Sequence, residues 1–389
     1  MKNGLFILTF CLLIGTMAFA QEDFHYVCET GQEMAFRIVS SVPPELMLMK
    51  CYDHFGGVTI PDTVEYNETK YAVVAIYTSA FSPGWGFTGP LVIPNTVREI
   101  GYGAFWDCWF TGPLVIPNSV ESIDTWAFRG CEKFSSLKLS QSLTTIREHT
   151  FADCYGFRGD LVIPESVEDV EPFAFENCGF DGTLYISPRM AICYDDAFVD
   201  CYNFSAVDIP EGVIYIDYFA FSNLVKPTEL ELPSTVTNIL DEAFGNMNRL
   251  EQMIVNASVP PHIHSTSFMQ TSRDIPVYIP VGTKEAYENA SNWSEFTNFI
   301  ELEGVGIVER DDAATATVYP NPGINTLNIQ INSPNAQVEV YDMAGQLIHS
   351  QTVAEGTVAI DATLWPSGVY VWRLVSEKKE KTTGKWIKK

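Results

Sequence analysis

A phenylalanine returns every 23 or 24 residues through the middle of this 389-residue chain. The series consists of Phe81, Phe105, Phe128, Phe151, Phe175, Phe198, Phe221, Phe244 and Phe268. Five residues before each stands an aliphatic residue, replaced once by Cys193. One unit of this length cannot bury its own apolar face, whereas stacked units can. The period therefore predicts a solenoid, and solenoids mostly present binding surfaces.

Each unit has the same two halves. It opens with alternating apolar residues that usually end at a proline, as in residues 91–94 and 114–117. This pattern predicts one short parallel strand per unit, because a proline after the last ladder hydrogen bond is tolerated. The half that carries the phenylalanine predicts a tight turn or a short helical turn. Nine extra residues around 65–72 in the first unit predict a hairpin.

The ends of a solenoid need caps that cover the last apolar coil. Residues 21–57 lack the repeat but contain alternating segments, and we expect them to form the N-terminal cap. Residues 277–301 begin like another strand and continue with a helical pattern. Tyr287, Trp293 and Phe296 are available there to cover the other end.

The composition changes after residue 300. Residues 301–314 contain glycine, aspartate and an alanine and threonine run, which is typical of a linker. Many short alternating segments then predict a small all-β immunoglobulin-like sandwich. We expect its strands at 326–331, 336–341, 346–352, 356–360, 369–375 and 385–389.

The first twenty residues have the pattern of a secretory signal. Lys2 precedes an apolar run, and Ala18-Phe19-Ala20 is a small-residue cleavage site. No later stretch reaches the roughly 18 consecutive apolar residues that a membrane span needs. The predicted boundaries are a signal peptide at 1–20, an N-terminal cap at 21–57, repeats with their C-terminal cap at 58–300, a linker at 301–314 and the all-β domain at 315–389.

The charge is strongly acidic and unevenly distributed. Seven basic and six acidic residues lie in 315–389, which leaves 16 basic and 43 acidic residues elsewhere, a net charge of −27. Such a surface repels nucleic acids and anionic lipids, so neither is expected as a partner. The charge serves solubility or, alternatively, weak binding of divalent cations.

Eight cysteines remain after signal cleavage. Five of them follow a repeat phenylalanine by three residues: Cys108, Cys131, Cys154, Cys178 and Cys201. Neighbouring coils are close enough for disulfides, but side chains in register point the same way, so we interpret these five and Cys193 as buried core residues. Cys28 and Cys51 lie outside the repeats, and a disulfide between them is possible because the protein is exported.

The repeats resemble the BspA-type leucine-rich repeats of bacterial surface proteins. The pattern IP–x–x–V–x–x–I–x–x–x–AF–x–x–C is complete at residues 93–108 and 116–131. The resemblance covers roughly residues 58–300 and implies a leucine-rich-repeat solenoid with adhesion or host and matrix contact as its function. The substituted positions, such as Ser140 for proline and Leu224 for cysteine, preserve packing.

The last 75 residues resemble the type A C-terminal sorting domain of the type IX secretion system. The matching segments are 318–322, 338–348 and 364–374, followed by the basic residues Lys385, Lys388 and Lys389. The resemblance implies passage from the periplasm across the outer membrane by the type IX machinery. It also implies removal of the domain by a sortase, after which the protein is anchored to surface lipopolysaccharide or released.

No catalytic or cofactor motif stands out. His262 and His264 flank a core position and predict two outward imidazoles, but no third metal ligand is evident beside them. The adjacent carboxylates at 195–196 and 311–312 are better interpreted as solvated turn or linker charges than as a glycosidase pair. We therefore expect neither an enzyme nor a cofactor.

Two outward columns of the repeats are candidate binding surfaces. The middle strand position carries Val92, Val115, Lys138, Val162, Tyr185, Asp208 and Glu231. A second set of aromatic residues outside the core comprises Trp85, Trp106, Trp109, Trp126, Tyr155 and Tyr202. An exposed apolar strip favours a partner, but β-branched residues also suit strands, and the aromatic residues can simply stack between coils.

These patterns predict a secreted or outer-membrane-surface protein, exported through the periplasm, that is adhesin-like and binds a protein or glycan. The candidate ligand-binding residues are Trp85, Val92, Trp106, Trp109, Val115, Trp126, Tyr155, Val162 and Tyr185. The alternative is a structural surface component without a specific ligand. The ligand, the oligomeric state and the anchored or released form do not follow from the sequence.

Overall fold

A computed structural model describes residues 23–302 and, nearer the C-terminus, 316–319, 326–331, 336–342, 347–353, 356–366, 368–375 and 381–388. The predicted signal peptide and the predicted linker from residue 303 lie outside these residues. The chain divides into two compact units, residues 1–306 and 307–389, which are described separately.

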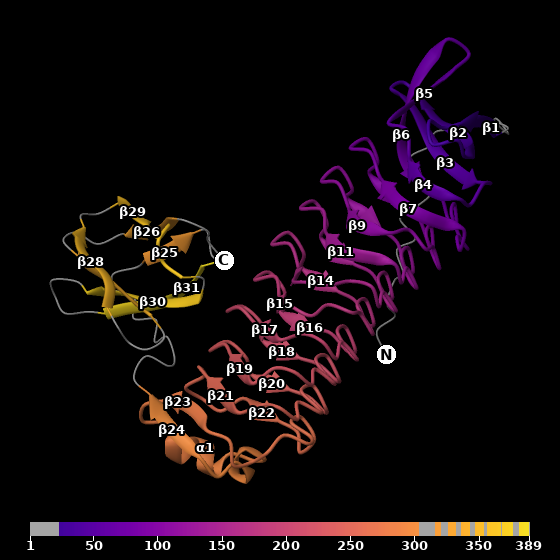
Figure 1. Ribbon diagram of the computed structural model, residues 1–389. Helices are drawn as coiled ribbons and strands as arrows, with labels where there is room; N and C mark the ends of the chain where they lie inside the picture. Colours follow the sequence, from indigo (N-terminus) through magenta and orange to yellow (C-terminus); the bar gives the residue numbers. More distant parts are fainter. Residues whose placement is uncertain are drawn as a thin grey trace. The chain divides into compact units, whose positions relative to one another are not determined.

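The first unit begins with an antiparallel sheet of β1 (Phe24–Val27), β2 (Glu33–Ser41) and β3 (Pro44–Cys51). Strand β3 pairs in parallel with β6 (Thr69–Ile76), so this sheet continues directly into the coils. Strand β5 (Thr63–Tyr66) pairs antiparallel with β6, which confirms the predicted hairpin. Figure 1 shows the coils following this sheet in sequence order.

The coils form two ladders of parallel strands, whereas the sequence predicts one. The first ladder holds the predicted strands: β4 (Gly56–Thr59), β7 (Phe87–Val92), β9 (Gly112–Val115), β11 (Phe134–Lys138), β13 (Leu161–Val162), β15 (Thr183–Tyr185), β17 (Ala206–Asp208), β19 (Glu229–Leu232), β21 (Gln252–Val255) and β23 (Val277–Pro280). It ends with β24 (Phe299–Leu302), in a segment where the sequence predicts a helical pattern instead. Its register keeps each repeat position aligned, as in Leu184 opposite Leu161 and Val207.

The second ladder begins at β6 and continues through strands of two residues each. They are β8 (Glu99–Ile100), β10 (Ser122–Ile123), β12 (Thr145–Ile146), β14 (Asp169–Val170), β16 (Ile192–Cys193), β18 (Tyr215–Ile216), β20 (Asn238–Ile239) and β22 (His262–Ile263). Two residues are too few to show an alternating pattern, which explains why this ladder was not predicted.

The phenylalanines stack along the core. Rings of consecutive coils lie 4.8–5.7 Å apart between centroids and are nearly parallel. Their backbones are also joined, since the amide of Phe105 donates to the carbonyl of Ala127 at 2.8 Å and the pattern repeats along the stack. The coils therefore adhere through both rings and backbone hydrogen bonds.

A second phenylalanine stack was not predicted. It contains Phe87, Phe110, Phe134, Phe157, Phe180 and Phe204, whose ring centroids lie 4.3–6.5 Å apart. All six are fully buried. The same period of 23 or 24 residues is visible in the sequence and would have identified it.

The last coil is covered by α1 (Lys284–Asn289) and the 3-10 helix η1 (Trp293–Glu295). Tyr287 and Trp293 are fully buried and satisfy carbonyls of the preceding coil. The Tyr287 hydroxyl donates to Ala257 at 2.6 Å, and the Trp293 indole donates to Pro261 at 2.7 Å. Predicted cap residues thus cover the end of the core.

The second unit contains two antiparallel sheets. One consists of β25 (Ala316–Tyr319), β26 (Thr326–Ile331) and β29 (Gly356–Asp361). The other contains β28 (Leu347–Val353), β27 (Ala336–Asp342), β30 (Gly368–Val375) and β31 (Lys381–Lys388). Side chains of both sheets share one core, which agrees with the predicted small all-β domain. Strand β25 was not predicted, and β31 starts four residues earlier than expected.

Candidate ligand-binding surfaces

The cysteine column lies inside the solenoid. Each thiol donates to the carbonyl of a stacked phenylalanine one coil earlier, at distances of 3.0–3.4 Å. Burial raises the pKa of the Cys108, Cys131 and Cys178 thiols well above the usual value, and that of Cys193 to about 12. These thiols are therefore neutral packing groups and not nucleophiles or metal ligands.

Cys28 and Cys51 are also buried, and each carries a free thiol in the structure. The Cys28 sulfur donates to the side-chain oxygen of Gln32 at 3.2 Å. The Cys51 sulfur donates to the carbonyl of Asp53 at 3.3 Å, and burial raises its pKa to about 12. The possible disulfide is thus not formed in this structure.

One candidate surface is the outward side of the first strand ladder, which we call the strand face. Val92 and Val115 are each 47% exposed and Val162 is 52% exposed. A groove of about 500 Å³ passes over Val92, Val115 and Lys138 and has Asn95 and Asn118 beside it. The predicted apolar column therefore lies on the surface, at a hollow with amide groups.

A second candidate surface lies where the chain turns before and after each stacked phenylalanine. Trp126 stands at its centre: Tyr102 stacks against it at 5.9 Å, and Trp106 meets it edge-on at 5.7 Å. The ring of His149 meets Trp126 at 5.9 Å and stacks on Phe173 at 4.9 Å. We call these five residues the aromatic patch.

The sequence placed Trp106 and Trp126 among the candidates but missed Tyr102, His149 and Phe173. Trp126, His149 and Phe173 occupy the same repeat position, two residues before a stacked phenylalanine. Because equivalent repeat positions stack on neighbouring coils, this shared position predicts that the three rings lie side by side.

The other predicted aromatic residues have separate surroundings. Trp85 is exposed, and Trp109 lies under the ammonium of Lys133, 5.5 Å from its ring centroid. Tyr155 is exposed and donates from its hydroxyl to Asp153 at 3.0 Å. Tyr185 is half-buried in the strand ladder.

The aromatic patch sits on unusual backbone. Trp126, His149 and Phe173 have φ of 64°, 52° and 59°, a left-handed conformation that is rare for bulky residues. A second left-handed position follows the stacked phenylalanines from Phe105 onward by two residues, and it mostly carries residues that tolerate this conformation. These are Asp107, Gly130, Asp153, Asn177, Asp200, Asn223, Asn246 and Gln270, of which only the last departs from glycine, asparagine and aspartate.

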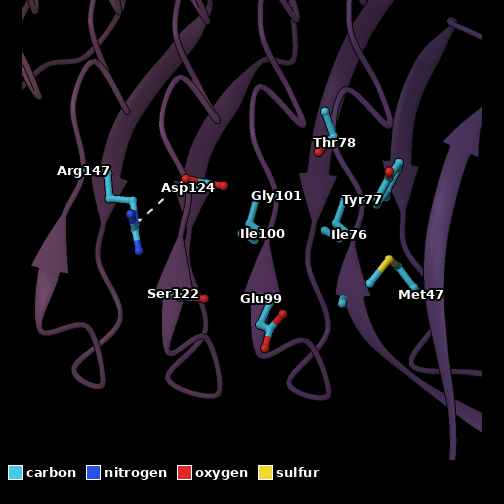
Figure 2. Close-up of a pocket in the computed structure, with 11 residues that line it drawn as sticks. Met47, Ile76, Tyr77, Thr78, Glu99, Ile100, Gly101, Ser122, Asp124 and Arg147 are labelled. Carbon is cyan, nitrogen blue, oxygen red and sulfur yellow. Dashed lines mark ion pairs between the residues drawn. The ribbon is translucent and has the colours of Figure 1, made fainter. Parts of the chain in front are cut away.

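A groove of about 460 Å³ is lined by residues that lie next to the aromatic patch in sequence, such as Gly101 before Tyr102. Figure 2 shows the residues that line it. Figure 2 shows Glu99 on one coil and Ser122 and Asp124 on the next, with Met47 at one end and Arg147 at the other. The guanidinium of Arg147 lies 3.9 Å from the carboxylate of Asp124. The groove therefore offers both donors and acceptors over an apolar floor that includes Ile76 and Ile100.

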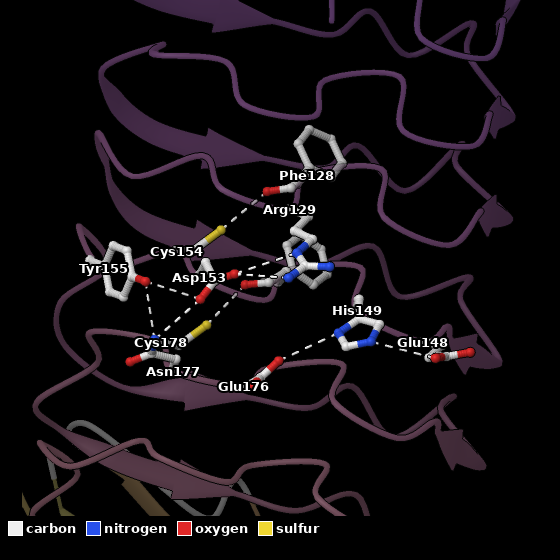
Figure 3. Close-up of polar contacts among 11 residues, drawn as sticks. Phe128, Arg129, Glu148, His149, Asp153, Cys154, Tyr155, Glu176, Asn177 and Cys178 are labelled. Atoms are coloured by element: carbon white, nitrogen blue, oxygen red, sulfur yellow. Dashed lines mark hydrogen bonds and ion pairs between the residues drawn. The ribbon is translucent and has the colours of Figure 1, made fainter. Parts of the chain in front are cut away.

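Polar contacts around Asp153 and His149 join neighbouring coils (Figure 3). Asp153 accepts from Arg129 at 3.4 Å, from Tyr155 at 3.0 Å and from the amide of Asn177 at 3.2 Å. The imidazole of His149 lies 3.5 Å from a carboxylate oxygen of both Glu148 and Glu176. These contacts hold the neighbouring coils in register.

The surroundings of His262 and His264 differ from the prediction, because His264 has an acidic neighbour. His264 Nδ1 lies 2.6 Å from the carboxylate of Asp241, an acidic neighbour that spacing did not reveal because it belongs to the preceding coil. A hydrogen bond from Thr266 and the contact with His264 lower the pKa of Asp241. Within the described residues, however, no group of three histidine, cysteine or acidic side chains is arranged to hold a metal.

Of the two pairs of adjacent carboxylates, only the pair at 195–196 lies within the described residues. Asp195 and Asp196 are half-buried and not fully solvated as expected. Burial, followed by the charge of Asp195, raises the pKa of Asp196 to about 7. The pair at 311–312 lies outside the described residues.

The repeats match a known family along most of the solenoid. Models of the BspA-type leucine-rich repeat region match in six copies, over residues 74–187 and 191–305. The chain belongs to the BspA-type leucine-rich repeat family. Residues 317–389 match the secretion system C-terminal sorting domain. No curated protein matches the sequence.

Solved structures similar to this BspA-type chain are bacterial leucine-rich repeat proteins. The T. pallidum leucine-rich repeat protein is 20% identical, with 49% of this chain and 86% of that chain covered and a TM-score of 0.43. A leucine-rich cell surface protein from Faecalibacterium prausnitzii is 16% identical (75% and 100% covered, TM-score 0.31). The pneumococcal vaccine antigen PcpA is 14% identical (72% and 99% covered, TM-score 0.34).

The two families place this BspA-type protein outside the cytoplasm. A type IX sorting domain implies contact with the secretion machinery, and the repeats are those of surface proteins. In the parts of the chain that the structure describes, no helix has both the length and the apolarity to cross a bilayer. The chain is an exported protein of the cell surface or the extracellular space.

Proposed function

We propose that this protein is an adhesin-like binding protein that recognises a protein or a glycan through its solenoid, and that it is not an enzyme. The observation that carries the proposal is the row of exposed valines over the strand-face groove. Val92 and Val115 line that groove together with Lys138, and Val162 continues the row on a later coil. Exposed apolar side chains beside polar groups are typical of a surface that meets a partner.

The nearly equal length of the coils supports a binding function rather than a catalytic one. A catalytic site needs several groups held at fixed geometry in a pocket, and enzymes commonly place them on loops. Here consecutive units differ in length by a single residue, apart from the β5–β6 hairpin. The coils therefore repeat one surface rather than build a cavity, which suits an extended ligand.

The sorting domain supplies the route to this function. It is proposed to be removed by a sortase after export, leaving the solenoid anchored to surface lipopolysaccharide or released. In either form the strand face is presented outside the cell, where protein and glycan ligands occur.

The strand face can be tested by a single charge substitution at its groove. The mature protein would be titrated against immobilised fibronectin, collagen and fibrinogen and against a glycan array. Val115→Asp should weaken any detected interaction at least tenfold, since about 1.4 kcal/mol is lost when one apolar contact is replaced by a desolvated carboxylate.

Ile214→Asp is the matched control. Ile214 is 46% exposed, almost the same as Val115, and lies just before β18 in the other strand ladder. Binding that is equally strong in wild type and Val115→Asp would show that the strand face is not the binding surface. Failure of every protein and glycan to bind would favour a structural component instead.

A further inference from the structure

We propose that the aromatic patch and the groove beside it form one binding site for a neutral polysaccharide chain. The inference rests on the proposed binding function and names its ligand class and a second site. The two surfaces are continuous, because the chain passes from groove to patch within two residues on three successive coils. The transitions are Gly101 to Tyr102, Asp124 to Trp126 and Arg147 to His149.

The rings of the patch are not required by the backbone. Trp126, His149 and Phe173 occupy left-handed positions, where a bulky residue costs about 1–2 kcal/mol. Gly103 fills the same position one coil earlier without that cost. Stacking between the rings returns energy of similar size, about 0.5–1.5 kcal/mol for each pair. Bulky rings at these positions therefore bring little net stability. Trp126 is half-buried and gives the exposed Tyr102 and Trp106 a ring to pack against.

The accessible faces belong to the outer members of the patch. Tyr102 is 41% exposed and Trp106 is 38% exposed, while Trp126 is covered from several sides by Tyr102, Trp106 and Arg129. A flat exposed ring packs well against the C–H face of a sugar, because that face is apolar and equally flat. Tyr and Trp also supply a polar edge for a hydroxyl.

The groove supplies the hydrogen bonds that such a ligand needs. Sugar hydroxyls both donate and accept, and the groove presents the carboxylates of Glu99 and Asp124, the hydroxyl of Ser122 and the guanidinium of Arg147. Mixed donors and acceptors over an apolar floor match a ligand that is apolar on its face and hydroxylated at its edge.

Charge favours a neutral sugar. Arg129, Lys133 and Arg147 each have a carboxylate partner, namely Asp153 at 3.4 Å, Glu132 at 3.6 Å and Asp124 at 3.9 Å. The ammonium of Lys50 donates to the carbonyls of Ser79 and Ser82. An anionic ligand would have to displace these carboxylates and approach a surface of net negative charge. A neutral ligand meets no such penalty.

The arrangement also favours a chain over a single sugar. The groove runs across several coils, from Met47 on β3 to Arg147 after β12. Adjacent strands lie about 4.8 Å apart, which is close to the length of one hexose unit. Successive sugars can therefore meet equivalent positions on successive coils.

The test uses the exported mature protein and titrates it with hexasaccharides of glucose, mannose and galactose and with an anionic oligogalacturonate. Binding would be followed by calorimetry. At least one neutral hexasaccharide should bind, and Tyr102→Ala and Trp106→Ala should each weaken it at least tenfold. Trp106→Phe, which keeps a ring, should lose less than Trp106→Ala.

Tyr218→Ala is the matched control, because Tyr218 occupies the repeat position of Tyr102 and is 42% exposed, but lies among acidic residues on a later coil. It should bind like wild type. Ser122→Trp, which fills the groove and removes no ring, should block binding.

Four outcomes would overturn the inference. Neutral sugars that bind equally to wild type, Tyr102→Ala and Trp106→Ala would exclude the patch, and tighter binding of oligogalacturonate would exclude a neutral ligand. Binding of a matrix protein with no binding of any sugar would refute the glycan site while leaving the proposed function intact. If neither proteins nor sugars bind, the proposed function itself fails.

Discussion

Phe151 shows how a single residue takes part in the cohesion of the solenoid. Its ring lies 5.6 Å from Phe128 and 5.3 Å from Phe175, and it is fully buried. Its carbonyl also accepts the thiol of Cys178 at 3.1 Å. One position in the repeat thus serves ring stacking, the thiol column and the backbone contacts between coils.

Phe151→Ala should lower the free energy of unfolding by about 3–5 kcal/mol, because it leaves a cavity between two rings. Urea denaturation would measure the loss. The control is Val162→Ala, an exposed position that should change stability by no more than about 0.5 kcal/mol. Equal effects of the two substitutions would contradict the proposed role of the stack.

Asp196 predicts a pH dependence. Because burial and Asp195 raise its pKa from 3.8 to about 7, the folded protein holds this proton more tightly than the unfolded chain does. The stabilising contribution of Asp196 is therefore fully present below the pKa that this carboxyl has in the unfolded chain. It declines as the pH rises towards about 7.

Asp196→Asn should remove this decline, since the amide carries no charge and tolerates the left-handed backbone at this position. Thermal unfolding should show a higher midpoint for the variant at about pH 7.5 and little difference at about pH 4. A gain of the same size at both pH values would mean that the ionisation of Asp196 is not its cause.

At the scale of elements, the C-terminal cap covers the apolar end of the last coil. Trp293 of η1 is fully buried, lies 5.9 Å from Phe268 and donates to the carbonyl of Pro261. It covers the last ring of the stack and satisfies backbone that has no further coil to pair with.

Trp293→Ala should destabilise the solenoid by about 3–5 kcal/mol and expose its last coil. Size-exclusion chromatography should then show oligomers that wild type does not form, because uncapped coils associate. Trp85→Ala, which removes an exposed indole elsewhere, is the control. A monomeric Trp293→Ala protein of unchanged stability would rule out this capping role.

Strand β31 of the sorting domain is held by a buried lysine. Lys388 is 7% exposed, and its ammonium donates to the carbonyls of Thr363, at 3.1 Å, and Trp365. Lys388 therefore links β31 to the turn before β30 through two hydrogen bonds from a charged donor.

Lys388→Met should lower the stability of the sorting domain by about 1–3 kcal/mol, as expected when a charged hydrogen-bond donor is lost. Amide hydrogen exchange in the full-length protein should show faster exchange in β30 and β31. Leu364→Ala, a change at a 94% exposed residue of the same turn, should leave exchange unchanged. Exchange that is as slow in Lys388→Met as in wild type would refute this role of Lys388.

At the scale of the whole molecule, the sorting domain and the repeats with the proposed binding surfaces belong to different units. The repeats end within residues 1–306, and the sorting domain lies within 307–389. Each unit has a hydrophobic core of its own. A change that affects export therefore need not affect the solenoid.

Deletion of residues 315–389 should retain the protein in the periplasm while its solenoid stays folded. Cell fractionation would locate the protein, and resistance to limited proteolysis would report the solenoid fold. The complementary fusion, in which residues 303–389 are joined to a periplasmic reporter, should be exported. Secretion of the truncated chain would contradict the sorting assignment.

Much of this molecule was readable from periodicity. The stacked phenylalanines, the cysteine column and the first strand ladder follow from residue types repeated at 23 or 24 positions, since a period forces equivalent burial in each coil. Resemblance then identified both families. The second phenylalanine stack has the same period of 23 or 24 residues and is equally predictable from it. The two-residue strands were not predictable, because they carry no pattern of their own.

The candidate sites depended on contacts between coils. The sequence alone determined that Trp106 and Trp126 lie outside the core. Only the tertiary structure brought Tyr102 and His149 against Trp126, placed Asp241 beside His264 and joined the patch to a groove. The physical reason is that burial is repeated by every unit, whereas a surface site is made by different residues of neighbouring units that meet only after stacking.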